Sequence, residues 1–344
     1  MGVPLVALAF SFALGAVLIA LIGRDPGAVY WELLRGTLGS PYGLGQVLFK
    51  ATPLIFTGLA CAVGFRAGLF NIGAEGQLYV GAFAAAWAGF TFPGLPAVLL
   101  VPVCFAAAAV AGGAWGAVPG YLKARFGAHE VINTIMLNFV ALALTSYLVS
   151  DVFVVPQTVH TPEIAPAAQV WRLERVLPLF AASPVNVTLL LALAAAAGCG
   201  FFLWRTRAGY ELRAAGLSPS AAECAGVRTG RATVHTMALS GALAGLGGTN
   251  FVMGYKHYFE SGFSNGLGFM GLAVALLGRN HPAGVVLAAL LFGLLSHGAL
   301  VINTMVPKEL LEILQAVVIL SVVVSGNIFQ DWVRGRSKAR VGAV

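Results

Sequence analysis

The sequence predicts an all-α integral membrane protein with about ten transmembrane helices, some of them interrupted or re-entrant. Hydrophobic residues make up 59% of the chain and charged residues only 10%. A soluble domain carries about 25% charged residues, so this chain lacks enough polar surface to fold in water. The mean hydropathy of +0.87 agrees with this interpretation. We therefore expect one transmembrane domain over residues 1–344, in the plasma (inner) membrane.

Apolar runs close to the ~20 residues that cross a bilayer recur along the chain. The first run lacks a basic segment before it and further runs follow, so we interpret it as a first helix and not as a signal peptide. The eighth run is too short for a straight crossing. The expected spans are 5–22, 47–63, 74–90, 97–118, 131–150, 185–204, 233–252, 265–278, 283–302 and 310–326.

The distribution of Lys and Arg predicts the orientation. If both termini are cytoplasmic, 13 of the 20 basic residues fall on the inner side, and acidic residues offset the basic ones outside. An excess of positive charge in cytoplasmic loops is typical of membrane proteins. The net charge of +7 therefore requires no nucleic-acid partner.

Two connections are long enough to have a function of their own. The outer connection, 151–184, contains five prolines, which favour an ordered cap or docking surface. In the inner connection, 205–232, Ser218 followed by Pro219 predicts the start of a short helix that Gly226 ends. That helix is either part of an ordinary basic loop or a docking element for a cytoplasmic partner.

The two halves of the chain resemble each other. Residues 68–82 and 262–276 share the placement of their glycines and one Asn. We expect a first repeat over 47–150, a linking helix over 185–204 and a second repeat of inverted orientation over 233–326. Inverted repeats with interrupted helices are typical of transporters, whose substrate path lies at the repeat interface.

Several enzyme classes do not fit the sequence. In HEVIN, Asn133 replaces the second His of a zinc-protease motif. GFSNG matches the pattern around a serine nucleophile at Ser264, but no general base is implied by position. No lysine follows a glycine, so the chain lacks a phosphate-binding P-loop, and ATP-driven transport would require a second chain that hydrolyses ATP. The four cysteines form no CxxC pair, and we expect no cofactor and no metal.

Polar side chains inside a bilayer are costly unless they face a cavity or a partner. We expect the substrate path to be lined by Asn71, Glu75, Gln77, Asn133, Thr134, Asn138 and Asn265. Asn133 and Asn138 are about 140° apart on a helix, so only one of them can face a narrow path. Glu75 has a second interpretation, because Asn71 can cap a helix whose first turn carries this acid.

Four stretches together resemble permease subunits of ATP-binding-cassette (ABC) importers for ribose-like sugars and nucleosides. These are GLFNIGAEGQ (68–77), NTIMLNF (133–139), RAAGLSPSAAECAGV (213–227) and LLGRNHPAGVVLAALLFGLLSHG (276–298). The first stretch resembles the nucleoside branch in particular. The third resembles the loop that couples such permeases to their ATPase. This resemblance assigns coupling roles to Arg213, Gly216, Ser218, Ala221, Ala222 and Gly226.

The resemblance implies a fold similar to the cobalamin-type importers and a permease that is not itself an enzyme. It implies three protein partners: a cytoplasmic ATPase with two fused cassettes, a second related permease in a heterodimer, and an extracytoplasmic binding lipoprotein. The expected substrates are purine nucleosides or nucleosides in general. A ribose-like sugar or an autoinducer is the alternative within the family. An ion-coupled secondary transporter, with Glu75 carrying charge, is the alternative outside it.

Overall fold

The computed structural model describes the whole chain except residues 1, 176–177, 181, 308, 311 and 322–344. The described residues form helices and connections and no β-strand; two isolated bridges, His160 with Glu260 and Arg172 with Asn186, are the exceptions. The prediction of an all-α membrane protein is therefore confirmed. The end of the predicted span 310–326 lies outside the described residues.

Among the described residues, the labelled α-helices follow one another up to Val301, with two π-helical and three 3-10 segments between them, and a further short helix covers Glu312–Ser321. They are α1 (Gly2–Leu21), α2 (Pro26–Leu38), α3 (Pro41–Arg66), α4 (Ala74–Thr91), α5 (Ala97–Phe126), α6 (Glu130–Tyr147), α7 (Thr188–Arg205), α8 (Arg207–Leu217), α9 (Pro219–Cys224), α10 (Thr229–Gly247), α11 (Thr249–Phe251), α12 (Leu267–Leu277) and α13 (Pro282–Val301). The other segments are η1 (Leu148–Val152), η2 (Pro166–Ala168), η3 (Leu173–Arg175), η4 (Pro178–Phe180) and η5 (Val252–Lys256).

Five helices in the described part of the chain are long and apolar enough to cross a membrane: α3, α5, α6 together with η1, α7 and α13. The pair α1 and α2, bent by 117° between them, adds a sixth if it is one span. Helix α2 was missed from the sequence, although its start has clear signals. Asp25 caps it by accepting a hydrogen bond from the Gly27 N–H at 2.9 Å, and Pro26 occupies its first position.

The chain divides into two compact units, residues 45–293 and the two flanking segments together. In the flanking unit, the Tyr30 hydroxyl donates to the Phe12 carbonyl at 2.7 Å, joining α2 to α1. Gly36 of α2 faces Val301 at the end of α13 so closely that a Cβ would lie 2.4 Å from a valine methyl. This unit therefore packs through specific contacts of its own.

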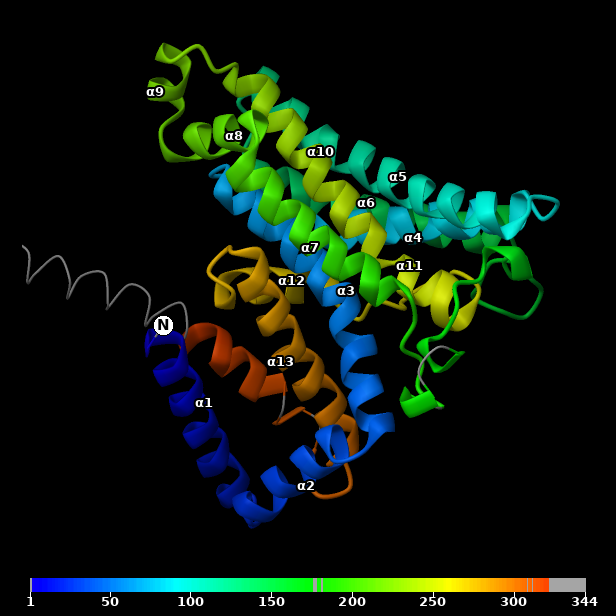
Figure 1. Ribbon diagram of the computed structural model, residues 1–344, viewed down its shortest axis with the longest axis vertical. Coiled ribbons are helices and arrows are strands. Elements are labelled where there is room, and N and C mark those ends of the chain that lie inside the picture. The colour runs from blue at the N-terminus through cyan, green and yellow to red at the C-terminus, as the bar shows by residue number, and fades with distance from the viewer. Residues whose placement is uncertain (1, 176–177, 181, 308, 311, 322–344) are drawn as a thin grey trace, which may run out of the picture. The chain divides into compact units, whose positions relative to one another are not determined.

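In the larger unit, α5 and α10 run side by side along a seam of small residues (Figure 1). A Cβ on Gly241 would lie 2.2 Å from the Gly112 carbonyl oxygen, and one on Gly116 would lie 2.4 Å from that of Met237. Small residues at four-residue spacing let membrane helices approach to backbone contact. Helix α4 packs against both helices and is buried on nearly all sides.

The segment after α6 folds back as the ordered cap that its prolines predict. The Ile164 N–H donates to the His257 carbonyl at 2.8 Å, and the Val170 N–H donates to that of Met253 at 3.0 Å. Ile164, Ala168 and Val170 are buried in one apolar cluster with Phe259. Backbone pairing and apolar packing together hold this cap on the end of the larger unit.

Candidate functional site

In the larger unit, two non-helical segments separate consecutive helices, and the helices that follow these two segments contact each other. Residues 67–73 separate α3 from α4, and residues 257–266 separate η5 from α12. A Cβ on Gly268, in the first turn of α12, would lie 2.2 Å from the backbone nitrogen of Glu75 in the first turn of α4. Only glycine permits this approach, so the two helix N-termini touch. We call this region, with the side chains that bond to it, the helix-break junction.

Glu75 bridges the two helix N-termini. One carboxylate oxygen accepts a hydrogen bond from the Ser264 hydroxyl, and the other accepts one from the Gly268 N–H at 2.6 Å. The first N–H groups of a helix have no intrahelical partner and carry partial positive charge. Gly266, the cap residue of α12, supplies no side-chain acceptor, so Glu75 of another helix caps α12 instead. This capping role explains why the Glu75 carboxylate is buried, with the residue only 4% exposed.

Asn71 organises the non-helical segment before α4. Its amide oxygen accepts from the Gly73 N–H at 2.9 Å, and its amide nitrogen donates to Gln77 at 2.9 Å and to the Ser240 hydroxyl at 2.7 Å. Ser240 in turn donates to the Ala60 carbonyl at 2.7 Å. These bonds tie α3, the first turn of α4 and the interior of α10 together. Asn71 therefore holds the start of α4 through a buried network and not through a simple cap.

Helix α6 supports the same segment from another side. The Asn138 amide oxygen accepts from the Gly76 N–H at 2.8 Å, and its nitrogen donates to the Ile72 carbonyl at 3.0 Å. Thr134, one turn earlier on this face, is fully buried beside Gly73. Asn133 points elsewhere, and its buried amide nitrogen has no hydrogen-bond partner among the described residues. Of the two asparagines, only Asn138 bonds to the segment before α4.

The structure brings together five of the seven residues expected on the substrate path: Asn71, Glu75, Gln77, Thr134 and Asn138. Asn265 is exposed, with φ of +47°, and its neighbour Ser264 makes the contact instead. Sequence reasoning considered Ser264 only as a nucleophile and overlooked Ser240. The signal for Ser264 was its place among glycines opposite the Glu75 motif, whereas Ser240 lies in a run of small residues without distinctive spacing.

In this conformation the helix-break junction is closed. Its side chains are buried and bonded to one another or to backbone groups. A solute can pass only if these bonds open and the polar groups meet the solute or water in exchange, because an unpaired buried polar group costs about 1–3 kcal/mol. The arrangement is suited to a gate that two helix ends form together.

The inner connection contains the helix that its sequence predicts. Ser218 precedes α9, its hydroxyl accepts from the Ala221 N–H at 3.4 Å, and Pro219 takes the first position. Gly226 follows the helix with φ of +84°. Ala221 is exposed whereas Ala222 is buried, so the two alanines face opposite ways.

The inner connection also contacts the start of the non-helical segment 67–73. A Cβ on Gly216, near the end of α8, would lie 2.4 Å from the Arg66 carbonyl oxygen. Gly68 has φ of +69° and lies against the Gly216 backbone in turn. Two glycines therefore bring α8 into backbone contact with the start of the segment that leads to Asn71. Beside α8, a cavity of about 410 Å³ is lined by Arg207, Glu211, Arg228, Arg231 and His235, among others.

Metal chemistry has no ligand set in the described residues, where no group of three or more His, Cys, Asp or Glu side chains is placed to hold an ion. Ser264 bonds to Glu75, whose other oxygen is held by the Gly268 N–H at the start of α12. Of the remaining chemistry-bearing groups, Glu130 forms an ion pair with Lys123 at 2.5 Å. The site thus consists of helix ends and hydrogen bonds.

Interrupted helices that meet in a buried polar centre are typical of membrane transporters. The comparison with known families agrees: the chain belongs to the family of permease components of branched-chain amino acid transport systems, whose model matches residues 43–323. It is a permease subunit of an ABC transporter in the plasma membrane and not itself an enzyme. Such a permease works with a separate ATPase and a substrate-binding protein.

Curated relatives cover nearly the whole chain. A guanosine ABC transporter permease of Bacillus subtilis, NupP, is 42% identical over 93% of this chain and 92% of its own length. A nucleoside ABC transporter permease of Lactococcus lactis, NupB, is 36% identical over 94% and 90%. A glucose ABC transporter permease of Haloferax volcanii, TsgB13, is 37% identical over 94% and 87%. No solved structure matches the chain.

Proposed function

We propose that this chain is the permease subunit of an ABC importer for nucleosides, of the purine type or of broad range. The observation that carries the proposal is the similarity, over more than nine-tenths of the chain, to the two permeases named for guanosine and for nucleosides. A sugar is the second candidate, since the relative named for glucose is 37% identical over a comparable length. Nucleosides contain a ribose, so the two candidates share part of their chemistry.

The substrate path runs through the helix-break junction in this proposal. Asn71, Glu75 and Gln77 line it from α4 and the segment before it, and Thr134 and Asn138 line it from α6. Asn133 and Asn265, which lie outside the bonded network, would reach the path only after the junction opens. Amide and hydroxyl groups suit the hydroxyls and ring nitrogens of a nucleoside. The bonds that close the junction are the ones that must open for passage, and this supports placing the gate there.

ATP hydrolysis on the partner drives the gate through the inner connection. The exposed face of α9 docks on the ATPase, with Arg213, Gly216, Ser218, Ala221, Ala222 and Gly226 shaping this connection. Gly216 lies against the Arg66 carbonyl, so a displacement of α8 reaches residues 67–73 by direct backbone contact. Alternating access then follows from movement of the two repeats about the junction.

The assembly contains two related permeases as a heterodimer, a double-cassette ATPase and an extracytoplasmic binding lipoprotein. About ten spans in two inverted repeats, a fold similar to cobalamin-type importers and cytoplasmic termini complete the proposal. The inner connection 205–232 then faces the cytoplasm, and the cap 151–184 faces outside. The excess of basic residues on the proposed inner side supports this orientation.

Substrate identity is tested with the reconstituted complex. We expect ATP-dependent uptake of labelled guanosine into proteoliposomes that contain the permeases, the ATPase and the binding protein. Unlabelled adenosine or uridine should compete if the range is broad, and glucose should not compete. Uptake of glucose with no competition by any nucleoside would overturn the nucleoside assignment and leave the family assignment intact.

Docking is tested at Ala221 and not at Ala222. Ala221→Arg places a charge on the exposed face of α9 and is expected to abolish coupling between ATP hydrolysis and uptake while the permease folds normally. Arg at the buried Ala222 would disturb packing and confuse the two effects. Leu217→Arg is the matched control for charge, because this side chain is 90% exposed and precedes Ser218, the N-cap residue of α9. Full coupling in Ala221→Arg would remove α9 from the interface.

A further inference from the structure

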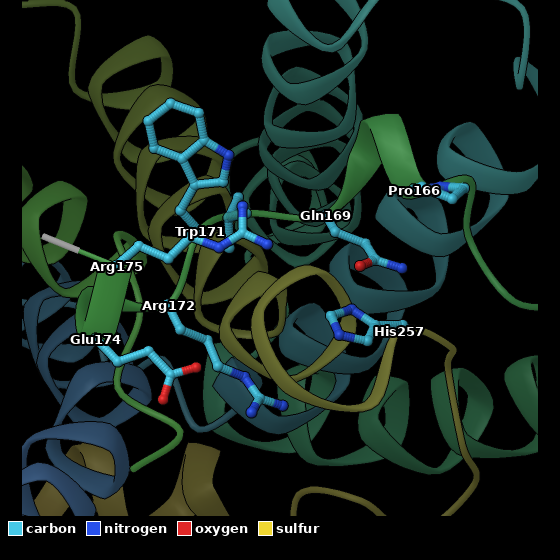
Figure 2. A pocket seen from close by; sticks show the side chains of 8 residues that line it. Pro166, Gln169, Trp171, Arg172, Glu174, Arg175 and His257 are labelled. Carbon is cyan, nitrogen blue, oxygen red and sulfur yellow. The ribbon is translucent and has the colours of Figure 1, made fainter. Parts of the chain in front are cut away.

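A second polar region lies where the cap meets His257, at the start of the non-helical segment 257–266. Its cavity of about 280 Å³ is lined by Gln169, Arg172, Glu174, Arg175 and His257, with Trp171 at its edge (Figure 2). We call it the arginine pocket. It is formed where residues 166–175 fold back onto the end of η5, an arrangement held by the bonds from Ile164 and Val170 to the backbone near His257.

The cationic groups of the arginine pocket lack partners. Neither Arg172 nor Arg175 forms an ion pair with a carboxylate among the described residues. Glu174 accepts a hydrogen bond from the Ala182 N–H at 3.1 Å, which ties its carboxylate to the following loop. The buried Nδ1 of His257 has no hydrogen-bond partner in the described part of the chain either. Two guanidinium groups and an unpaired imidazole nitrogen are suited to an anion, and arginine matches phosphate with paired hydrogen bonds.

An apolar groove adjoins the arginine pocket directly. Its volume is about 300 Å³, and the two cavities share Gln169, Val170 and Trp171. The groove is otherwise lined by Ala97, Val98, Val101 and Pro102 at the start of α5 and by Val187 before α7. Helices α5 and α7 are both long and apolar enough to span a membrane. The groove therefore lies where two candidate spans begin.

Trp171 marks the boundary between the two cavities. Its side chain is 63% exposed, and in Figure 2 it extends from the segment in the opposite direction to Arg172 and Glu174. Val98 in the groove is 82% exposed. Exposed tryptophan is typical of the membrane–water interface, where its ring lies at the level of the lipid headgroups. An exposed tryptophan between a cationic cavity and an apolar groove fits a position at this boundary.

We propose that the arginine pocket and the adjoining groove form one binding site for an anionic phospholipid. The phosphate lies between Arg172 and Arg175, and an acyl chain lies along Val98 and Val101. Basic pockets beside membrane helices bind anionic lipid headgroups by this combination of charge and apolar contact. A free anion would not need the groove, and an acidic segment of a partner protein would not use its lipid-facing wall. The occupied site ties the cap 151–184 to α5 and α7.

The test measures lipid binding to the full-length permease by native mass spectrometry from detergent. Titration with dioleoyl phosphatidylglycerol and, separately, with dioleoyl phosphatidylcholine gives the preference for the anionic headgroup. We expect the wild-type protein to bind phosphatidylglycerol about tenfold more tightly, equivalent to about 1.4 kcal/mol. The double variant Arg172→Gln, Arg175→Gln should lose this preference. Arg172→Lys, Arg175→Lys should keep most of it, because the charge remains.

A matched control separates this site from general charge. Arg24→Gln, Arg35→Gln removes the same charge from two exposed positions on the same proposed side of the membrane and should leave the preference unchanged. Val98→Asn should weaken both lipids alike, because it places a polar amide on the apolar wall of the groove. Melting temperatures in phosphatidylcholine identify any variant that fails to fold, and the Lys pair and Val98→Asn then provide independent tests.

Two outcomes would overturn the proposal. If glycerol phosphate displaces phosphatidylglycerol completely and Val98→Asn changes nothing, the pocket is a site for a free anion. If the Arg172→Gln, Arg175→Gln variant retains the lipid preference but loses capture of the purified binding lipoprotein, the pocket is a protein-docking site. Loss of the preference in the glutamine pair alone, with the control pair intact, supports the lipid site.

Discussion

The helix-break junction and the arginine pocket both gather polar side chains in the larger unit, but they differ in how those side chains are satisfied. In the junction, Glu75 has a donor for each oxygen and Asn71 bonds through both ends of its amide. In the arginine pocket, two guanidinium groups lack ion-pair partners among the described residues. The first region completes its own bonding, and the second offers bonding to something else.

The difference indicates what each region can do. A buried polar network that is fully bonded stabilises one conformation, and to bind a solute it must first break. Charged groups that lack an ion-pair partner are available to a ligand without the loss of existing bonds, so binding there requires little rearrangement. We therefore expect substitutions in the junction to change stability and gating together, and substitutions in the pocket to change binding with little effect on folding.

The largest expected effect is at Glu75. Glu75→Ala leaves the Gly268 N–H and the Ser264 hydroxyl without their acceptor, which should lower the free energy of unfolding by about 3 kcal/mol. Glu75→Gln retains one acceptor oxygen but removes the charge at two helix N-termini, so its loss should be smaller. Thermal unfolding in detergent, monitored by thiol labelling of the buried Cys61, measures the loss of stability in both variants.

Ser264→Ala is the matched control for this prediction. It removes one of the two bonds to Glu75 and should cost about 1 kcal/mol, leaving the bond to α12 in place. If Glu75→Ala unfolds like the wild-type protein yet transports nothing, the carboxylate belongs to the substrate path and the structural explanation is wrong. Such a result would make the junction resemble the arginine pocket, with a charge reserved for a ligand.

The next effect concerns the contact between the inner connection and the junction. Gly216→Val forces a side chain into the backbone of residues 66–67. Its Cβ alone would lie 2.4 Å from the Arg66 carbonyl oxygen. Overpacking of this kind costs about 1–3 kcal/mol. We expect ATP hydrolysis by the complex to continue while uptake falls, because the contact that moves residues 67–73 is displaced. Hydrolysis and uptake are measured on the same proteoliposomes.

Gly200→Val is the control for Gly216. Gly200 lies inside α7, and a Cβ there would meet nothing within 4 Å. The same change of residue should therefore leave stability within about 0.5 kcal/mol and leave uptake unchanged. Equal loss of uptake in both variants would contradict a specific role for the contact at Gly216.

The sequence predicted the larger features because they depend on local composition. Long apolar runs located α3, α5, α7 and α13, and the Ser218–Pro219 pair located α9. The polar cluster was also predicted, since Asn, Glu and Gln are conspicuous in an apolar chain. The partners of those residues were not predicted: Glu75 and Ser264 are 189 residues apart, and nothing local links them. Helix α2 was missed because it is short and its mean hydropathy is moderate.

The arginine pocket was not predicted at all, and the reason is again distance along the chain. Arg172 and Arg175 stand in a short amphipathic patch, whereas His257 follows the end of η5. Only the backbone pairing of the cap with residues 253–259 brings them together. A cluster built by a loop that folds back has no periodic signal in the sequence, unlike one built on the face of a helix.

The smallest expected effect is a pH dependence at His257, which lies outside the membrane-spanning helices. Burial, followed by the charge of Arg172, lowers the pKa of His257 below its ordinary value of 6.5, while Glu163 and the Met253 backbone act in the opposite direction. Below pH 6.5 the unfolded chain then binds more protons than the folded one. This part of the stability is complete above pH 6.5 and is lost as the pH falls toward the folded pKa.

His257→Gln removes this dependence. On going from pH 7.5 to pH 5.5 the variant should therefore lose less stability than the wild-type protein, and this difference should be smaller than the effects of the changes at Glu75 and Gly216. Melting temperatures at the two pH values, in phosphatidylcholine nanodiscs, measure the difference. In phosphatidylglycerol the lipid phosphate would offset the charge of Arg172 and raise the pKa of His257, so the pH dependence of the wild-type protein should shrink. An identical pH dependence in both lipids would indicate that no anion reaches the imidazole, and would separate His257 from the lipid site that the two arginines form.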